Sequence, residues 1–430
     1  MDQENIQLST KLKPGFPGLA SFFLCLLVSV TATSGQLDDE FSSGLDALDN
    51  DRLKTAREIF HGILSDSPGL HRARLELARA YYMSLDYKQA RAQAQHVLDD
   101  PNTPASVRTT VLAFVAQIDE DEKNRAVKHS WTPSIYLGLM HDTNVNVGPE
   151  NQLLLPLGGL LNESAVERDD NAFVITPGIS HTYNPGKRFE LGEHSGYFLW
   201  QSQASYYHRA YFDEDDFNLG VLHAGTGPVW VVPRHWRAGI GISFDQIWLG
   251  GSPLALFSGI NPNVTWQLND NTEFSLNGLL SSRDYNESSN KPLEGNYRSL
   301  GASLGHYMND KKFAVRVGGK LFDFDARGER FSHDGWEVFL GGVMQAWTNG
   351  SLFARAGYQT FDFDGQEPDF GFSREDDEHR YTVGFQHAFK AGTLNDWTLS
   401  GNFVRTDNES NVSIFDYDRD QYSLGLSRNF

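Results

Sequence analysis

Cysteine is almost absent from this chain: Cys25 is the single example among 430 residues. It lies inside an apolar run, Leu19–Val30, which follows Lys11 and Lys13. A short apolar run after positive charges is typical of a secretory signal peptide, and this run is too short to span a bilayer. We therefore predict a signal peptide over residues 1–32. The exported chain then has no thiol, which excludes disulfides and thiolate metal sites.

Long apolar runs and basic residues are also scarce. The mean hydropathy is −0.44, which excludes a protein with several membrane-spanning helices, since each needs ~20 apolar residues. The 36 basic residues face 56 acidic ones, which argues against a nucleic-acid partner. In contrast, 40 Gly, 29 Phe, 16 Tyr and 9 Trp are typical of an all-β protein. A transmembrane barrel is also hydrophilic on average, because only alternate residues touch lipid.

Common catalytic motifs are missing as well. The chain has no His-Glu-x-x-His, phosphate-binding loop or dinucleotide fingerprint. The segment Asp142–Asn146 is similar to the start of a calcium loop, but Val147 and Leu153 occupy the positions that need glycine and a bidentate carboxylate. We expect a turn there, and a protein that is not an enzyme and has no cofactor or metal. A lipid-facing Ser–His pair that meets across strands is the catalytic alternative.

Residues 37–128 have a helical pattern with an internal repeat. Ala56 and Ala90 stand 34 residues apart, which is the tetratricopeptide period, and Pro68 and Pro101 end the two segments. This part resembles a tetratricopeptide module of two repeats with a capping helix over 106–127.

The resemblance implies that the first helix of each repeat lines a concave surface. On this chain it places four residues on one stripe that would bind a client: Arg72, Leu75, Arg79 and Tyr82. Docking of an extended partner segment is one interpretation of this stripe. A solvated helix face is the other.

After residue 131 the apolar period changes from 3.6 to two. In the segment Trp236–Phe244 the even-numbered residues are apolar and the odd-numbered ones are Arg, Gly or Ser, the pattern of a strand with one apolar face. Such runs predict fourteen strands, over 134–147, 172–183, 196–209, 216–230, 236–248, 254–267, 273–285, 295–308, 313–324, 335–347, 351–361, 378–389, 397–405 and 420–430.

The connections between these strands alternate in length. Most of those after odd-numbered strands are long or acidic, and most of the others are tight turns such as Asn309–Lys311. A soluble sandwich has no reason to sort its loops, whereas an outer-membrane barrel has short periplasmic turns and long external loops. We predict a small all-α tetratricopeptide module followed by an all-β transmembrane barrel of about 14 antiparallel strands over 131–430. The terminal Phe430 fits the aromatic end of a barrel-assembly signal.

Charged residues are predicted both inside the barrel and on its external loops. Five basic residues are predicted to face the lumen: Arg237, Arg316, Lys320, Arg355 and Arg380. Inward Asp245, Glu273 and Glu337 favour salt-bridged packing, and a path for an anionic client is the alternative. The acidic clusters Asp213–Asp216 and Glu375–Glu378 are predicted on external loops, where they are solvated or are bridged to lipopolysaccharide by divalent cations; a dedicated metal site is the alternative.

The order of a signal peptide, tetratricopeptide repeats and a fourteen-stranded barrel that opens with Tyr136–Asn146 resembles the surface lipoprotein assembly modifier family. The resemblance implies an outer-membrane translocator or assembly factor that helps specific secreted proteins or lipoproteins reach the surface of a Gram-negative bacterium. It implies three partners: that client, outer-membrane lipid with lipopolysaccharide, and the barrel assembly machinery. The helical module would lie in the periplasm. An exopolysaccharide export porin and a general solute porin with a periplasmic adaptor are the alternatives.

Overall fold

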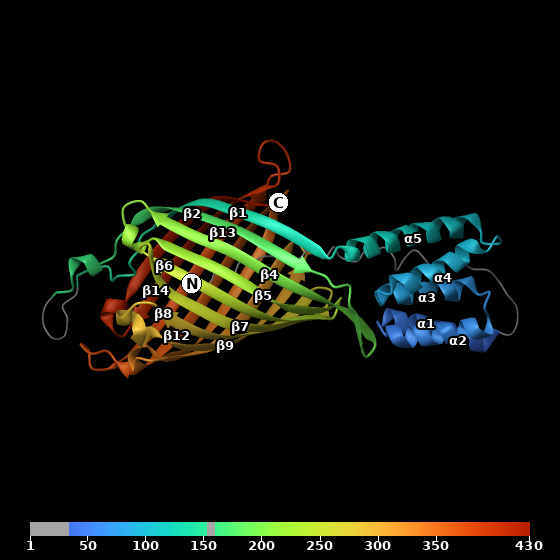
Figure 1. Ribbon diagram of the computed structural model, residues 1–430, viewed down its shortest axis with the longest axis horizontal. Coiled ribbons are helices and arrows are strands. Elements are labelled where there is room, and N and C mark those ends of the chain that lie inside the picture. Colours follow the sequence, from blue (N-terminus) through green and yellow to red (C-terminus); the bar gives the residue numbers. More distant parts are fainter. Residues whose placement is uncertain (1–33, 153–159) are drawn as a thin grey trace. The chain divides into compact units, whose positions relative to one another are not determined.

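The computed structural model describes residues 34–152 and 160–430 (Figure 1). The chain divides into two compact units, Met1–Val111 and Leu112–Phe430. The predicted signal peptide, residues 1–32, lies outside the described residues.

The helical part of the described chain has five α-helices: α1 Ser34–Asp49, α2 Leu53–Asp66, α3 His71–Met83, α4 Tyr87–Asp99 and α5 Ala105–Ala126. The repeat alanines Ala56 and Ala90 are both 0% exposed, which lets neighbouring helices approach closely. A Cβ on Gly44 would lie 2.7 Å from the Phe60 ring, so this glycine makes room for the largest side chain of the core. The tetratricopeptide prediction is confirmed. Among the described helices, none is both long enough and apolar enough to cross a membrane.

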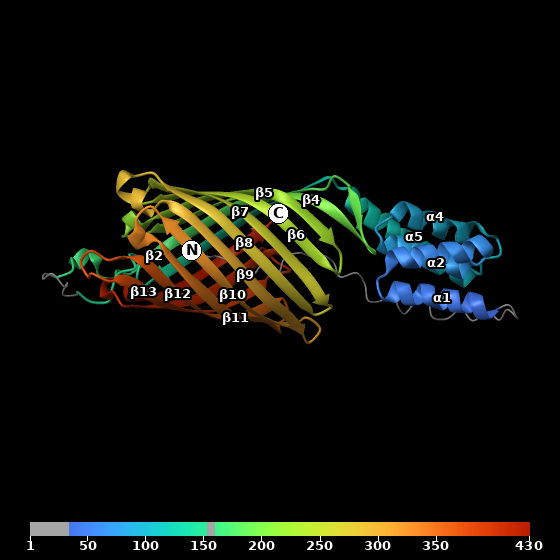
Figure 2. The same ribbon diagram turned by 90° about the horizontal axis from the view of Figure 1, so that it is seen from below.

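The second part is a closed antiparallel barrel of fourteen strands within the described residues. Figure 2 shows the tilted strands that form its wall. The strands are β1 His129–Asp142, β2 Asp170–Tyr183, β4 His194–Tyr211, β5 Leu219–Val232, β6 Trp236–Leu249, β7 Ser252–Asn269, β8 Thr272–Tyr285, β9 Gly295–Met308, β10 Phe313–Ala326, β11 His333–Trp347, β12 Gly350–Gln366, β13 Ser373–Ala388, β14 Trp397–Ser410 and β15 Tyr417–Asn429. The short β3, Arg188–Leu191, pairs with the start of β4. Pairing of β1 with β15 closes the barrel at a seam.

The architecture predicted from alternation is confirmed, with two corrections. The first strand was predicted over 134–147 but spans His129–Asp142. It ends there because the Asp142 carboxylate accepts a hydrogen bond from the Asn144 backbone N–H and turns the chain. The cluster Glu375–Glu378, predicted on a loop, lies in β13, where Arg374 and Arg380 pair with its acids.

The two ends of the barrel differ. The turn end, where β1 begins and β15 finishes, has tight connections such as 270–271 and 348–349. Asn349 has φ 60°, a left-handed conformation that asparagine tolerates. The loop end, where β1 finishes, has longer connections, among them 143–169.

The two faces of the wall also differ. On β6 the side chains of Ile240, Ile242 and Phe244 are 46–48% exposed, as an outer face in contact with lipid requires. The alternate residues Arg237 and Asp245 lie on the other side of the strand, toward the lumen.

Candidate functional site

The middle of the lumen is lined by ion pairs. The five predicted basic residues lie on the side of their strands opposite to the exposed apolar belt: Arg237, Arg316, Lys320, Arg355 and Arg380. Glu337 on β11 accepts from Lys320 on β10 at 3.0 Å and from Arg355 on β12 at 2.9 Å. Because one carboxylate joins three neighbouring strands, these charges are largely neutralised within the wall.

Two of the other cations also have acidic neighbours. Arg237 lies 3.0 Å from Glu273 across the intervening β7, and Arg380 lies 2.9 Å from Glu378. Arg316 is exposed on the lumen side of β10. The pairing fits the salt-bridged packing expected from the sequence, and whether an anionic client uses this surface stays a prediction.

Toward the loop end, aromatic rings replace these ion pairs. The Arg283 guanidinium lies over the rings of Tyr297, at 4.4 Å, and Phe324, at 4.6 Å. Phe322 packs 5.3 Å from Phe361. Phe322 and Phe324 are 6% and 5% exposed and lie on the same side of β10 as Lys320. These five residues, the arginine–aromatic layer, give the lumen side of β8, β9, β10 and β12 a packed, weakly polar lining.

A buried polar cluster lies at the seam, also toward the loop end. The Asp142 side chain is 0% exposed, and its carboxylate accepts from the Tyr211 hydroxyl at 2.6 Å. Arg419 on β15 donates to both of its oxygens, at 2.8 and 2.5 Å, and the Gln421 amide donates at 2.9 Å. Arg209 adds a cation 4.0 Å away. We call these five residues the seam cluster, because they tie β1, β4 and β15 together.

The segment after Asp142 folds back into the mouth of the barrel. The Asn144 amide donates to the carbonyls of Gly148, at 2.8 Å, and Asp418, at 2.9 Å, and its oxygen accepts from the Gly148 N–H. Val145, 4% exposed, packs with Met140 and other buried apolar residues. The oxygens that were similar to a calcium loop are therefore satisfied by the protein itself. Within the described residues, no group of three or more His, Cys, Asp or Glu is placed to hold a metal ion.

Sequence reasoning singled out Asp142 but missed its partners. Arg419 and Gln421 are polar residues at successive inward positions of β15, whose outward positions from Tyr422 to Leu426 are apolar. This signal marks them as lining the lumen. It does not reveal that they meet a residue on the first strand, since that pairing depends on closure of the whole barrel.

The predicted stripe on α3 is partly buried. Leu75 is 5% exposed, so its prediction as a groove-lining side chain is wrong, because α3 is covered by neighbours on several sides. Arg72 is exposed, with its guanidinium 4.4 Å from the Phe41 ring. Arg79 pairs with Asp49 at 3.7 Å, and the Tyr82 ring packs against the tilted Tyr87 ring with centroids 5.8 Å apart. Client binding by these three residues stays a prediction.

The same α3 buries one acid, Glu76, which lies 3.5 Å from Arg79. Burial raises the pKa of Glu76 above its ordinary value, although Arg79 opposes the shift. At the other end of the chain, the Phe430 side chain is 63% exposed, and its N–H donates to the Pro133 carbonyl at 2.9 Å. A part for Phe430 in barrel assembly stays a prediction.

Comparison with known proteins gives two family matches. A family model described as surface lipoprotein assembly modifier matches residues 131–430, and a tetratricopeptide repeat model matches residues 47–110. A protein of Pasteurella multocida (strain Pm70), described as "Surface lipoprotein assembly modifier", is 22% identical over 404 residues, which cover 88% of this chain and 74% of that protein.

Solved barrels are similar at lower identity. A loop-deletion mutant of OmpT, an outer membrane protein of Vibrio cholerae, is 6% identical with a TM-score of 0.41, covering 70% of this chain and 100% of its own. OprD of Pseudomonas aeruginosa is 8% identical with a TM-score of 0.37, covering 70% of this chain and 95% of its own.

Proposed function

The chain belongs to the surface lipoprotein assembly modifier family, and from this premise we propose that it is an outer-membrane translocator or assembly factor for specific lipoproteins or secreted proteins. The observation that carries the proposal is the family match over residues 131–430, which covers the barrel almost completely. Its action needs binding and passage but no bond-making chemistry.

The geometry supports a gated route rather than an open pore. The ion pairs around Glu337 offer a polar path for a polypeptide. The arginine–aromatic layer and the seam cluster narrow the path at the loop end. A client would have to displace or bypass these groups, which suits an occasional large cargo better than steady diffusion of solutes.

The order of elements supports a periplasmic helical module. The turn end of the barrel, where β1 begins directly after α5, has the short connections that face the periplasm in outer-membrane barrels. On this assignment the helices engage the client before it enters the barrel. Outer-membrane lipid, lipopolysaccharide and the barrel assembly machinery are the further partners we propose.

Deletion of the gene tests this function. Intact cells of the wild type, the deletion strain and the complemented strain are treated with a protease, and mass spectrometry quantifies the lipoproteins that are cleaved. We expect a small set of lipoproteins to lose cleavage in the deletion strain and to regain it on complementation. Unchanged cleavage of every surface lipoprotein would contradict the proposal.

A further inference from the structure

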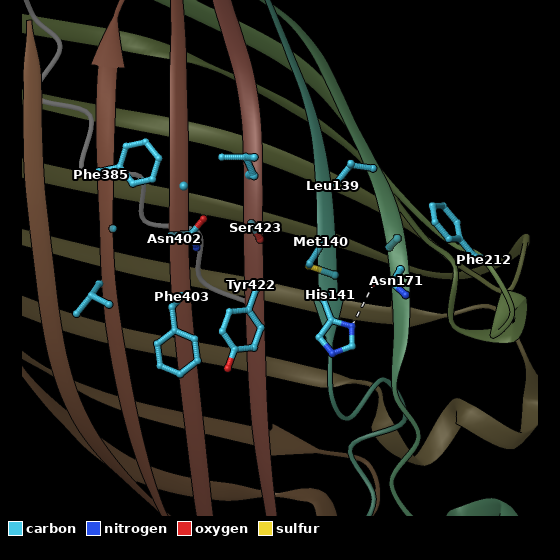
Figure 3. A pocket seen from close by; sticks show the side chains of 15 residues that line it. Leu139, Met140, His141, Asn171, Phe212, Phe385, Asn402, Phe403, Tyr422 and Ser423 are labelled. Carbon is cyan, nitrogen blue, oxygen red and sulfur yellow. Dashed lines mark hydrogen bonds between the residues drawn. The ribbon is translucent and has the colours of Figure 1, made fainter.

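The outer face of the barrel has a groove of about 590 Å³ at the seam, where the last strands meet the first (Figure 3). It crosses β13, β14, β15, β1 and β2. Its largest apolar and aromatic side chains are Leu139, Phe212, Phe385, Phe403, Tyr422 and Leu424. Because this face is the one that meets lipid, an occupant of the groove has to be soluble in hydrocarbon.

One glycine makes room for an aromatic ring of the groove. Gly401 on β14 lies in register between Phe385 on β13 and Leu424 on β15. A Cβ at this position would lie 2.5 Å from the Phe385 ring and 3.4 Å from a Leu424 methyl group. The Phe385 ring therefore lies over the backbone of β14 at Gly401 and forms part of the floor, with Leu424 beside it.

One edge of the groove is polar. His141 lies in register with Tyr422 on one side and Asn171 on the other, in the row nearer the loop end. The His141 and Asn171 side chains form a hydrogen bond of 3.2 Å, and the rings of His141 and Tyr422 stack at 6.2 Å. These three side chains offer hydrogen-bond donors beside outer-face lining residues that are otherwise apolar. Since β1 ends at the next residue, Asp142, this edge lies near the level where lipid chains meet their head groups.

We propose that the groove binds the acyl anchor of a client lipoprotein while the polypeptide crosses the membrane. This proposal rests on the proposed function. A lipoprotein that reaches the surface has to move its acyl chains as well as its polypeptide, and the ion-paired lumen around Glu337 is a poor solvent for hydrocarbon. The groove keeps the chains in the bilayer, directly outside the seam.

The polar edge gives the site its orientation. The acyl chains lie against Leu139, Leu424 and the floor at Gly401. The ester and amide carbonyls that join the chains to the client's first residue accept hydrogen bonds from His141, Asn171 or Tyr422. An ordinary apolar patch on a barrel would contact the acyl chains but would offer no hydrogen bonds to these carbonyls.

Photocrosslinking tests binding with a defined probe. The full-length protein, with Phe403 replaced by benzoylphenylalanine, is placed in phosphatidylcholine nanodiscs with a fluorescent peptide whose N-terminal cysteine carries three palmitoyl chains. A second protein has benzoylphenylalanine at Leu300, an outer-face residue of β9 that is 61% exposed. We expect crosslinking at position 403 at least ~10 times stronger than at 300, blocked by excess unlabelled lipopeptide but not by added phosphatidylglycerol. Equal labelling at both positions, or equal competition by the phospholipid, means adventitious lipid contact only and overturns the proposal.

Filling the groove tests its use in cells. Gly401→Val places a branched side chain where the Phe385 ring lies and pushes that ring outward into the groove. The matched control is Gly278→Val on β8, in register with the outward Leu300 and outside the groove. We expect Gly401→Val to lower surface display of the deletion-sensitive lipoproteins at least ~5-fold, while Gly278→Val retains it. Both variants must give the wild-type amount of folded barrel on unheated gels.

These outcomes separate the two proposals. Suppose that deletion of the gene abolishes display but that Gly401→Val gives the same display as the wild type. The groove proposal is then wrong, and the proposed function stands. If display does not depend on the gene at all, the proposed function is wrong, whether or not the lipopeptide crosslinks to the groove in nanodiscs.

Discussion

Arg419 on the last strand donates two hydrogen bonds, of 2.8 and 2.5 Å, to the Asp142 carboxylate on the first strand, 277 residues earlier in the chain. The Asp142 side chain is completely buried and that of Arg419 is 17% exposed. This ion pair joins the first and last strands through side chains at the loop end, next to the backbone pairing of Asp142 with Gln421.

Removing the acid should therefore weaken the barrel. Asp142→Ala leaves Arg419 and Arg209 without their carboxylate in a buried site, a loss of about 3–5 kcal/mol for a pair of this kind. We expect a lower urea midpoint for unfolding in detergent, read from the heat-sensitive mobility of the barrel on gels. Asp323→Ala is the control, because Asp323 and Arg298 form a pair whose side chains are 52% and 61% exposed. Equal midpoints for the two variants would contradict a structural role for the seam cluster.

The arginine–aromatic layer should keep the wild-type barrel closed to sugars. We expect no swelling of proteoliposomes in small sugars with the wild type, and measurable swelling with Phe322→Ala/Phe324→Ala, since these rings are almost fully buried in the lumen. Phe244→Ala removes a ring of the same kind from the outer face, where Phe244 is 48% exposed. Rapid swelling with the wild type would favour the solute porin.

Much of this barrel could be predicted because lipid and lumen impose a strict alternation on every strand. Wherever that alternation holds, as in Trp236–Phe244, strand and face follow from a few neighbouring residues. It fails at the loop end, where both sides of β13 carry acids: outward Glu375 and Asp377, and inward Asp376 and Glu378, which are 4% and 8% exposed. A dense run of acids is typical of a solvated loop. The structure shows instead that Arg374 and Arg380 form ion pairs with two of these acids within the strand.

The candidate sites were less accessible to sequence reasoning. The contacts of Asp142 join β1, β4 and β15, and no local pattern encodes a meeting of three distant strands. The groove depends on Gly401 standing in register between Phe385 and Leu424, which only the pairing reveals. In the helical module, the 34-residue period predicted the repeats. The same resemblance placed Leu75 on an open, client-facing surface, whereas neighbouring residues cover its side chain.

Glu76 should make the helical module sensitive to pH. Burial raises the pKa of Glu76 in the folded state, so the folded protein holds this proton more tightly than the unfolded chain. The stability of the module therefore falls as pH rises from the ordinary value of 4.5 through the raised pKa, by about 1.4 kcal/mol for each pH unit that separates the folded from the unfolded pKa. We expect Glu76→Gln to remove this fall and to slow hydrogen exchange in α3 at pH 7, whereas Glu58→Gln, at an exposed site on α2, should leave both unchanged. Faster exchange in Glu76→Gln would mean that the ion pair with Arg79 outweighs burial.

The exposed part of the α3 stripe should matter for clients rather than for folding. Arg72 is exposed, and its guanidinium lies over the Phe41 ring. Arg72→Glu would repel an acidic client segment; it removes one cation–π contact, of about 0.5–1 kcal/mol, and the attraction of Arg72 for Glu76. We expect surface display of the deletion-sensitive lipoproteins to fall several-fold, with an unchanged amount of folded protein, whereas Lys54→Glu, the same charge reversal on the exposed side of α2, should retain display. If both reversals lower display equally, the module responds to its overall charge and the stripe is not the docking site; if neither does, the stripe is a solvated helix face.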